Sequence, residues 1–325
     1  MSLNPAPREE SAARDADAAP ASGFGAPIFA IINPVSCSDG AEAMRAEIER
    51  ILGGWGMTAG FAETCETETA LPLAHKAVAQ GARLILAVGG DGTIMESINA
   101  ALDSEDVAIG IVPAGTGNLL AANLGIPVGD LEAALEIAVR GRVRRIDLVS
   151  VDGGAYYFAI MGGMGYDAQI MRATSRALKQ RAGKLAYVWG ALREMAGQRF
   201  HARIVLDGRR QLSVRAKCVL VANMGGLGPS VQLFPSASPT DGLLDVGVIR
   251  ASSFWELARL TWLMLRGVPE ESPDFDVYTA RSVSVQTRRT VPIEFDGEDI
   301  GDGAALRVEV KPRAVAVMVA AEPQA

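Results

Sequence analysis

The chain has 325 residues, a net charge of −7 and 49% hydrophobic residues. This length allows two hydrophobic cores, and the acidic charge argues against a general nucleic-acid-binding protein, which usually carries a basic domain. Three scattered cysteines and two histidines argue against a disulfide framework, a zinc site or a histidine-based metal centre, and favour a reducing cytosol.

Residues 1–25 predict a disordered leader, because they are rich in Ala, Pro and charged residues and lack the apolar core of a signal peptide. No segment of the sequence approaches the roughly 20 apolar residues that span a bilayer. The nearest candidate, residues 254–268, is short and is interrupted by Glu256, Arg259 and Arg266.

The first half of the chain alternates between strand and helix patterns. Strands are expected at residues 27–34, 58–64, 83–90 and 107–113, and helices at 41–52, 70–80, 93–102, 118–123 and 130–139. Such alternation predicts a parallel sheet with helices on both faces. Ligands of these sheets bind outside the carboxyl ends of the strands.

The second half has mostly short strand patterns. They are expected at residues 145–151, 156–161, 202–207, 212–223, 244–249, 282–286, 291–295 and 305–310, with helices at 167–195 and 255–265. Many short strands with turn signals predict an antiparallel sandwich or barrel-like domain. A last strand, residues 314–320, is expected to return to the first domain.

Two glycine-rich turns follow buried strands of the first half. One is Gly-Gly-Asp-Gly-Thr at residues 89–93, and the other is Pro-Ala-Gly-Thr-Gly-Asn at residues 113–118. Glycines let the backbone approach a polyanion, and the free N–H groups of a helix start attract phosphate. Asp91 would repel a phosphate, so on this interpretation it orients water, magnesium or a ribose hydroxyl. The alternative is a structural turn with Thr93 as a helix cap. Neither turn is a P-loop or a GxGxxG fingerprint.

Carboxylates at two turns of the second half could supply the magnesium ligand and the proton acceptor that phosphoryl transfer needs. Asp241 and Asp245 flank one turn, and Asp296 and Glu298 flank the other. Magnesium prefers such hard oxygen ligands, and a carboxylate can accept a hydroxyl proton. Asp-Gly is also the commonest hairpin signal, so each turn alone has a purely structural alternative.

Taken in order, these motifs resemble the diacylglycerol kinase catalytic-domain family, which includes bacterial lipid kinases and the sphingosine and ceramide kinases. The resemblance covers residues 27–320. It implies an α/β fold with an N-terminal three-layer Rossmann-like nucleotide domain, a C-terminal β-sandwich domain and an active site in the cleft between them. The implied boundaries are residues 26–148 for the nucleotide domain, with 312–325 returning to it, and 149–311 for the lipid domain.

The resemblance also implies roles for individual residues. ATP would be bound by the strand-end residues and the two turns, namely Asn33, Thr64, Gly89, Gly90, Asp91, Gly92, Thr93, Glu96, Gly115, Thr116, Gly117 and Asn118. A structural Mg²⁺ would be held by Ser238, Asp241 and Leu243, through one carboxylate and two main-chain carbonyls. Asp147 would support the active site, and the catalytic base would be Glu298 or Asp296, with Glu298 favoured.

Two positions depart from the family pattern. Cys37 stands where a glycine is usual after the first strand, and Leu119 replaces an acidic residue after the second glycine turn. The second departure is more similar to the sphingosine-kinase-like branch than to the bacterial diacylglycerol kinases. The sequence therefore leaves the identity of the lipid open.

The expected function is transfer of the γ-phosphate of ATP to a hydroxyl of a membrane lipid, in phospholipid metabolism. The alternatives are an NAD kinase-like phosphotransferase and a non-catalytic lipid- or nucleotide-binding protein on the same scaffold. The expected location is the cytoplasm, with peripheral contact to the inner face of the membrane; no nucleic-acid partner is expected, and a homodimer is left open. The basic cluster at residues 172–184 is the first candidate for the membrane contact, and the aromatic helix at 254–266 is the second. The alternatives are a solvated basic face for the cluster and a core helix for residues 254–266.

Overall fold

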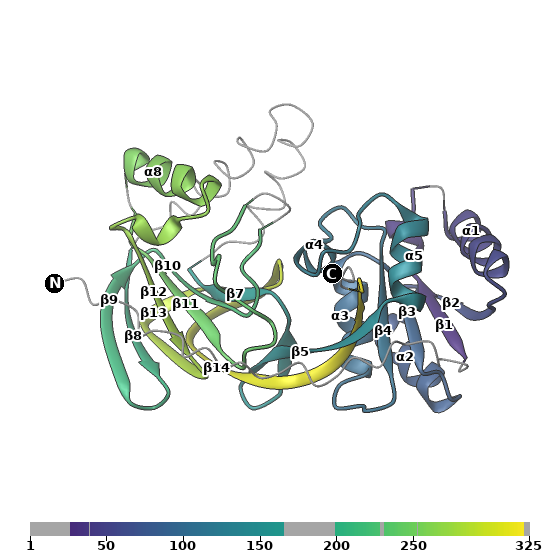
Figure 1. The fold of residues 1–325 in the computed structure, drawn as a ribbon. Helices are drawn as coiled ribbons and strands as arrows, with labels where there is room; N and C mark the ends of the chain where they lie inside the picture. The colour runs from purple at the N-terminus through teal and green to yellow at the C-terminus, as the bar shows by residue number, and fades with distance from the viewer. Residues whose placement is uncertain (1–26, 39, 166–198, 228–230, 252, 322–325) are drawn as a thin grey trace. The chain divides into compact units, whose positions relative to one another are not determined.

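The computed structural model describes residues 27–321, apart from residues 39, 166–198, 228–230 and 252 (Figure 1). The predicted leader, the predicted helix at 167–195 and its basic cluster therefore lie outside the described residues. The described chain divides into two compact units. Residues up to Ile146, with Arg313 onward, form what we call the α/β unit, and Asp147–Pro312 form what we call the β unit.

The α/β unit contains a parallel sheet in the strand order β14-β4-β3-β1-β2. Its strands are β1 (Ile28–Ile32), β2 (Ala59–Glu63), β3 (Leu84–Gly89), β4 (Ala108–Pro113) and the last residues of β14 (Glu298–Val319). Every residue of β3 is buried. Continuous apolar runs of this kind are typical of strands that are covered on both faces.

Five helices cover this sheet: α1 (Ala41–Gly54), α2 (Ala70–Ala79), α3 (Asp91–Ala100), α4 (Leu119–Asn123) and α5 (Leu131–Arg140). Side chains of α1 and α5 form one apolar cluster with alternate residues of the strands, among them Ile32 and Leu86. The residues between these, such as Ile31 and Ile85, point to the other face and are fully buried. Because α2 and α3 contact β1 and β3, helices cover both faces, which confirms the predicted three-layer fold.

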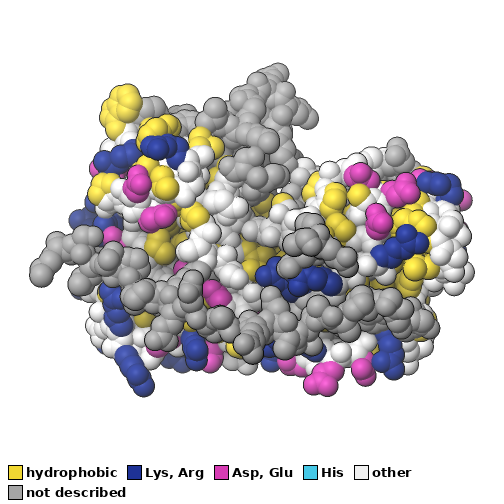
Figure 2. Space-filling view, viewed as in Figure 1, with side chains coloured by type: hydrophobic (Ala, Val, Ile, Leu, Met, Phe, Trp, Pro, Cys, Tyr) yellow, Lys and Arg dark blue, Asp and Glu magenta, His cyan; other side chains and the backbone are white. Residues whose placement is uncertain are grey.

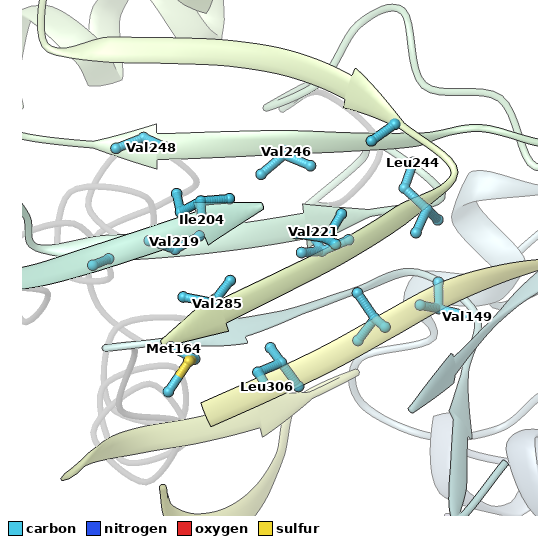
Figure 3. Close-up of a cluster of buried hydrophobic side chains, with 14 of the residues drawn as sticks. Val149, Met164, Ile204, Val219, Val221, Leu244, Val246, Val248, Val285 and Leu306 are labelled. Carbon is cyan, nitrogen blue, oxygen red and sulfur yellow. The ribbon is translucent and has the colours of Figure 1, made fainter. Parts of the chain in front are cut away.

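The β unit is antiparallel. Its strands are the last residues of β5 (Arg142–Val151), β6 (Tyr156–Phe158), β7 (Met161–Met164), β8 (Phe200–Leu206), β9 (Arg210–Ala216), β10 (Cys218–Ala222), β11 (Leu244–Ile249), β12 (Phe275–Ala280), β13 (Ser282–Phe295) and the first part of β14. The order is β12-β11-β10-β7-β13-β14, with β8 and β9 beyond β13, and β5 and β6 beside β14. Their inward side chains form one apolar core, shown in Figure 3. One helix, α8 (Phe254–Leu265), and the short helices η1 (Pro34–Ser36) and η2 (Pro269–Glu271) complete the described elements.

Several predicted element boundaries were wrong. The predicted strand 212–223 is two strands that separate at Lys217, and the predicted strand 156–161 is split between β6 and β7. The predicted strands 282–286 and 291–295 form one strand, with a register shift between Gln286 and Val291. Likewise, 305–310 and 314–320 belong to the single strand β14. Strand β12 was not predicted, since Asp276 interrupts its apolar pattern.

Candidate active site

Four parallel strands bring the predicted nucleotide residues to one edge of the sheet in the α/β unit. Asn33 follows β1, Thr64 follows β2, and the two glycine turns follow β3 and β4. The N–H of Asn33 donates to the carbonyl of Val88 at 2.9 Å, and that of Thr64 donates to the carbonyl of Ile32 at 2.9 Å. The structure therefore places these segments at the carboxyl ends of neighbouring strands, where α/β sheets bind ligands.

The two glycine turns are in direct backbone contact. The carbonyl of Gly89 accepts hydrogen bonds from the N–H groups of Ala114 and Gly115, at 2.9 and 3.2 Å. A Cβ atom added to Gly115 would lie 2.5 Å from the Cα of Gly90, a distance that real Cβ atoms essentially never show. Glycine at position 115 is therefore required by the close approach of the two backbones.

Asp91 joins the two turns. Its Oδ1 accepts a hydrogen bond from the backbone N–H of Leu120 at 3.1 Å, in the first turn of α4. A Cβ on Gly117 would meet Oδ2 of Asp91 at 2.8 Å. A carboxylate beside a helix start is stabilised by the unpaired N–H groups there. This contact gives the acid of the first glycine turn a structural role that needs no ligand.

Thr93 does not cap the helix, so the expected cap was wrong. Helix α3 begins at Asp91, two residues before the predicted start, and its N-cap is Gly90. The Thr93 side chain is buried, and its hydroxyl accepts a hydrogen bond from Nδ2 of Asn33 at 2.9 Å. The N–H groups in the first turn of α3 have no partner within the helix, so this turn is suited to bind an anion.

Two further predicted residues, Glu96 and Asn118, form hydrogen bonds with backbone groups of α2 and of the second glycine turn. Oε2 of Glu96 accepts from the N–H of Leu71 at 3.0 Å, which caps the start of α2. Asn118 has a left-handed backbone with φ of 51°, and its buried side chain bonds both the N–H and the carbonyl of Gly115, at 3.0 and 2.7 Å. Thr116 and Gly117, which lie between Gly115 and Asn118 in the chain, are exposed.

In the β unit, Asp147 organises the turn that carries the predicted magnesium ligands. Its side chain is buried, its Oδ2 accepts from the N–H of Gly242 at 2.8 Å, and its own N–H donates to the carbonyl of Pro239 at 2.7 Å. Oδ1 of Asp241 accepts from the N–H of Leu243 at 3.0 Å, and the hydroxyls of Ser238 and Thr240 lie 3.3 Å apart.

This turn fits magnesium by its donor chemistry. No group of three or more His, Cys, Asp or Glu side chains in the described part of the chain is arranged to hold a metal. The predicted set needs a single carboxylate, from Asp241, with the main-chain carbonyls of Ser238 and Leu243. These are all hard oxygen donors, which Mg²⁺ prefers.

Asp296 and Glu298, the two candidates for the catalytic base, have different surroundings. Asp296 and Gly297 have φ of 48° and 86° and form the two-residue turn between β13 and β14, so the Asp-Gly hairpin signal is confirmed. The Asp296 carboxylate accepts hydrogen bonds from the backbone N–H groups of Ala159, Ile160 and Met161, at 2.7, 2.9 and 2.9 Å.

Glu298, in contrast, is exposed and accepts from the hydroxyl of Tyr156 at 3.0 Å. Burial, together with the negative charge of Glu298, raises the pKa of Tyr156 above its ordinary value. Tyr156 therefore remains protonated at physiological pH and remains a donor to Glu298. The arrangement leaves Glu298 accessible to a substrate, whereas three backbone donors occupy the Asp296 carboxylate.

Three residues near these sites were not predicted. Ser36 lies in the Asn-Pro-Val-Ser segment after the first strand, whereas Tyr156 and Asn223 carry no sequence signal. Tyr156 contacts Glu298 across 142 positions of the chain. Asn223 is buried and donates to the carbonyls of Asp147 and Ala159, at 2.9 and 2.8 Å. Ser36 has its Oγ 3.9 Å from the position that a Cβ on Gly90 would occupy.

Comparisons with known proteins identify the family of the chain. The diacylglycerol kinase catalytic domain matches residues 27–151, and the YegS C-terminal NAD kinase beta sandwich-like domain matches residues 161–319. A Chromohalobacter salexigens protein named "Probable lipid kinase YegS-like" is 30% identical over 242 residues, which are 72% of this chain and 76% of that protein.

A Bacillus subtilis protein named diacylglycerol kinase is 29% identical over 275 residues, 82% of this chain and 88% of its own length. The crystal structure of a diacylglycerol kinase from Bacillus anthracis has the same fold, with a TM-score of 0.69 and 19% identity over 90% of this chain and 96% of that one. The chain therefore belongs to the family of diacylglycerol kinases and YegS-like lipid kinases, which confirms the family predicted from its motifs.

Proposed function

We propose that the protein transfers the γ-phosphate of ATP to a hydroxyl group of a membrane lipid, such as a diacylglycerol or a sphingoid base. The observation that carries this proposal is the backbone contact between Gly90 and Gly115 at the start of α3. It leaves an edge of the sheet without side-chain bulk beside a helix N-terminus, and polyphosphates bind at such places.

On this proposal, ATP binds at the strand ends of the α/β unit. The N–H groups of Gly92 and Thr93 face the phosphates, and the exposed Thr116 and Gly117 lie against the nucleotide. Asn33 and Asp91 position these groups, since one bonds Thr93 and the other bonds the start of α4. Phosphoryl transfer depends mainly on such positioning and on charge stabilisation.

Glu298 takes the proton from the lipid hydroxyl as that oxygen bonds to the γ-phosphorus, and the bond from this phosphorus to the β-phosphate oxygen breaks so that ADP leaves. Its exposed carboxylate has a hydrogen bond from Tyr156, which orients it and leaves other lone pairs for the substrate. Asp296 instead holds the 159–161 backbone against the hairpin, which fixes the position of Glu298 two residues later.

Mg²⁺ would be held at the 238–243 turn by Asp241 and the carbonyls of Ser238 and Leu243, with Asp147 fixing the turn. When bound there it stabilises the local structure, and the magnesium that accompanies ATP is part of the substrate. The enzyme would act at the inner face of the cytoplasmic membrane without being integrated into it.

The test is transfer of labelled phosphate from ATP to a panel of lipids presented in mixed micelles, with NAD as a parallel acceptor. We expect transfer to at least one lipid hydroxyl, at least about a hundredfold reduced in Glu298→Gln. Transfer to NAD alone would establish the NAD kinase alternative. ATP binding without transfer to any acceptor would establish a non-catalytic protein.

A further inference from the structure

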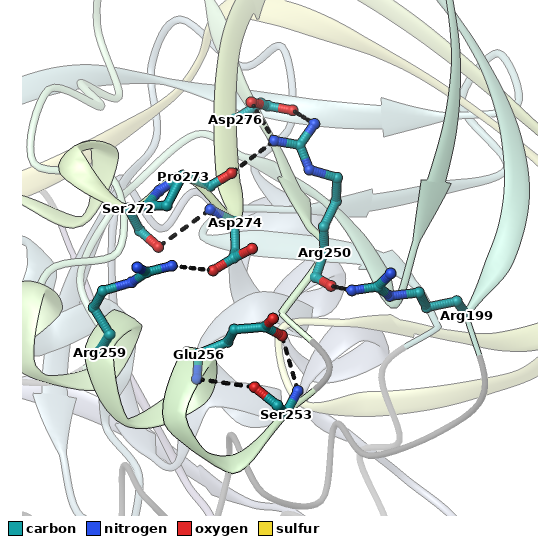
Figure 4. Close-up of polar contacts among 9 residues, drawn as sticks. All are labelled: Arg199, Arg250, Ser253, Glu256, Arg259, Ser272, Pro273, Asp274 and Asp276. Atoms are coloured by element: carbon teal, nitrogen blue, oxygen red, sulfur yellow. Dashed lines mark hydrogen bonds and ion pairs between the residues drawn. The ribbon is translucent and has the colours of Figure 1, made fainter.

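Helix α8 is firmly attached to the β unit by one of its faces. Leu257, Leu260, Leu263 and Met264 are buried. A capping box begins the helix: the Ser253 hydroxyl accepts from the N–H of Glu256, and the Glu256 carboxylate accepts from the N–H of Ser253. Arg259 pairs with Asp274 in the segment before β12, and Arg250 pairs with Asp276 within β12 (Figure 4). The helix is therefore a rigid element with a fixed outward face.

The outward face alternates between tryptophan and arginine. Trp255 is 78% exposed and Trp262 is 55% exposed, and Arg259 and the C-cap residue Arg266 are exposed as well. The spacing of 4, 3 and 4 residues places these four side chains in one line along the helix. We call them the Trp-Arg stripe. Figure 2 shows hydrophobic and basic side chains over this helix, with acidic side chains next to them.

This composition is unusual for a surface in contact with water. The large hydrophobic residues exposed in the described part of the chain are Val35, Val128, Trp255, Trp262 and Ile300, so two of the five lie on this stripe. Surface helices normally expose acidic and basic residues together. Within the described positions of α8 the one acid is Glu256, which is engaged in the capping box, and the acidic pair Glu270 and Glu271 follows in η2, after the helix has ended.

Tryptophan and arginine together match the chemistry of a bilayer interface. The indole ring is apolar with one N–H, which suits the headgroup level of a bilayer, and arginine binds lipid phosphate while its methylene chain remains in the apolar layer. The guanidinium of Arg266 lies 4.6 Å from the centre of the Trp262 ring, so charge and ring are presented together.

We infer that the Trp-Arg stripe of α8 docks on the surface of a bilayer that contains anionic phospholipid, with the helix axis in the plane of the interface. The inference rests on the proposed function, because a kinase whose substrate stays in the bilayer must reach it from the interface. None of the described helices is long and apolar enough to cross a membrane. The positive charge of Arg266 complements the anionic headgroups, which a second copy of the same stripe would not do, whereas the charge of Arg259 is already paired with Asp274.

The test is co-sedimentation of the full chain with vesicles of phosphatidylglycerol and phosphatidylcholine, and with vesicles of phosphatidylcholine alone. We expect preferential binding to the anionic vesicles, weakened by salt. Trp255→Ser with Trp262→Ser should lower the partition coefficient by about tenfold or more, and Arg266→Gln by severalfold. Matched controls are Val128→Ser and Arg209→Gln, which remove an exposed apolar side chain and an exposed arginine elsewhere.

Kinase turnover on two forms of substrate separates this inference from the proposed function. On a short-chain, water-soluble lipid the double tryptophan variant should keep wild-type turnover, whereas on vesicles its turnover should fall with its binding. A chain without activity on any lipid would refute the proposed function, while the vesicle-binding result would still decide the role of the stripe.

Two outcomes would overturn the inference. One is binding of the double tryptophan variant to anionic vesicles as strong as that of the wild type, with the controls also unchanged. The other is that light scattering shows a dimer for the wild type and a monomer for the double tryptophan variant. The stripe would then be the contact surface with a second copy of the chain.

Discussion

Replacing Gly115 by alanine tests whether the two glycine turns act as one nucleotide site. The added Cβ would lie 2.5 Å from the Cα of Gly90 and 3.2 Å from its nitrogen, both backbone atoms that cannot rotate away. Ordinary contacts begin at 3.4 Å, so the turns would have to separate by about 0.9 Å. The change therefore acts on the spacing of the two backbones and adds no charge or polar group.

The magnitude follows from this displacement. Overpacking of a fitted contact typically costs about 1–3 kcal/mol of the free energy of unfolding. A misplacement of about 1 Å can cost about a hundredfold in rate when the displaced groups position a reacting phosphate. We therefore expect kcat/KM for ATP to fall by about a hundredfold, while the protein remains folded.

The assay combines steady-state kinetics over a range of ATP concentrations with chemical denaturation. Gly53→Ala is the matched control, because a Cβ there meets nothing within 4 Å and Gly53 lies in the last turn of α1. That variant should be as active as the wild type and more stable by about 0.5–1 kcal/mol. If Gly115→Ala retained activity within threefold of wild type, the contact between the two turns would have a structural role only. The assignment of these turns as one nucleotide site would then be refuted.

Three further predictions concern single side chains. Asp91→Ala should lower the free energy of unfolding by about 1 kcal/mol, because the N–H of Leu120 loses its acceptor, and should abolish transfer; activity within threefold of wild type would contradict this. Glu298→Gln should lower turnover by roughly 10²–10⁴ without changing the KM for ATP, whereas Asp296→Asn should mainly lower the midpoint of denaturation; the reverse pattern would exchange their roles. Burial and the neighbouring Arg199 lower the pKa of Lys217 in the folded protein below its ordinary 10.5. Between that lowered pKa and 10.5 only the unfolded chain holds the proton, so the free energy of unfolding of the wild type should rise with pH in this range. Lys217→Met should lose that rise, and a pH profile of stability unchanged by the substitution would disprove the prediction.

The sequence was sufficient to predict the position of the glycine turns because local chemistry determines them. A buried apolar strand that enters consecutive glycines has few alternatives to a strand-to-helix turn, and parallel strands bring such turns to one edge. The contact between Gly90 and Gly115 is not local. It depends on the register of β3 and β4, which pairs Gly89 with Pro113, and a single sequence does not show this register.

The roles of Asp296 and Glu298 could not be separated from the sequence, because both lie at the same hairpin. What distinguishes them is the backbone of residues 159–161, more than 130 positions earlier in the chain, which β7 brings beside the end of β13. The same limit applies to Asp91: its partner, the start of α4, is 29 residues away. Where hydrogen bonds connect distant segments, residue type and spacing give the candidates but not their roles.

Strand β14 has a consequence for the order in which the chain can fold during translation. Its last residues pair with β4 at the edge of the parallel sheet, at Ala316 and Val317. The ribosome must therefore synthesise all of residues 147–312 after β4 before this edge can be covered, which at elongation rates of about 5–20 residues per second takes roughly 8 to 33 s. Throughout that time the nascent α/β unit exposes the unpaired backbone of β4, an apolar edge suited to chaperone capture or to misassembly between nascent chains.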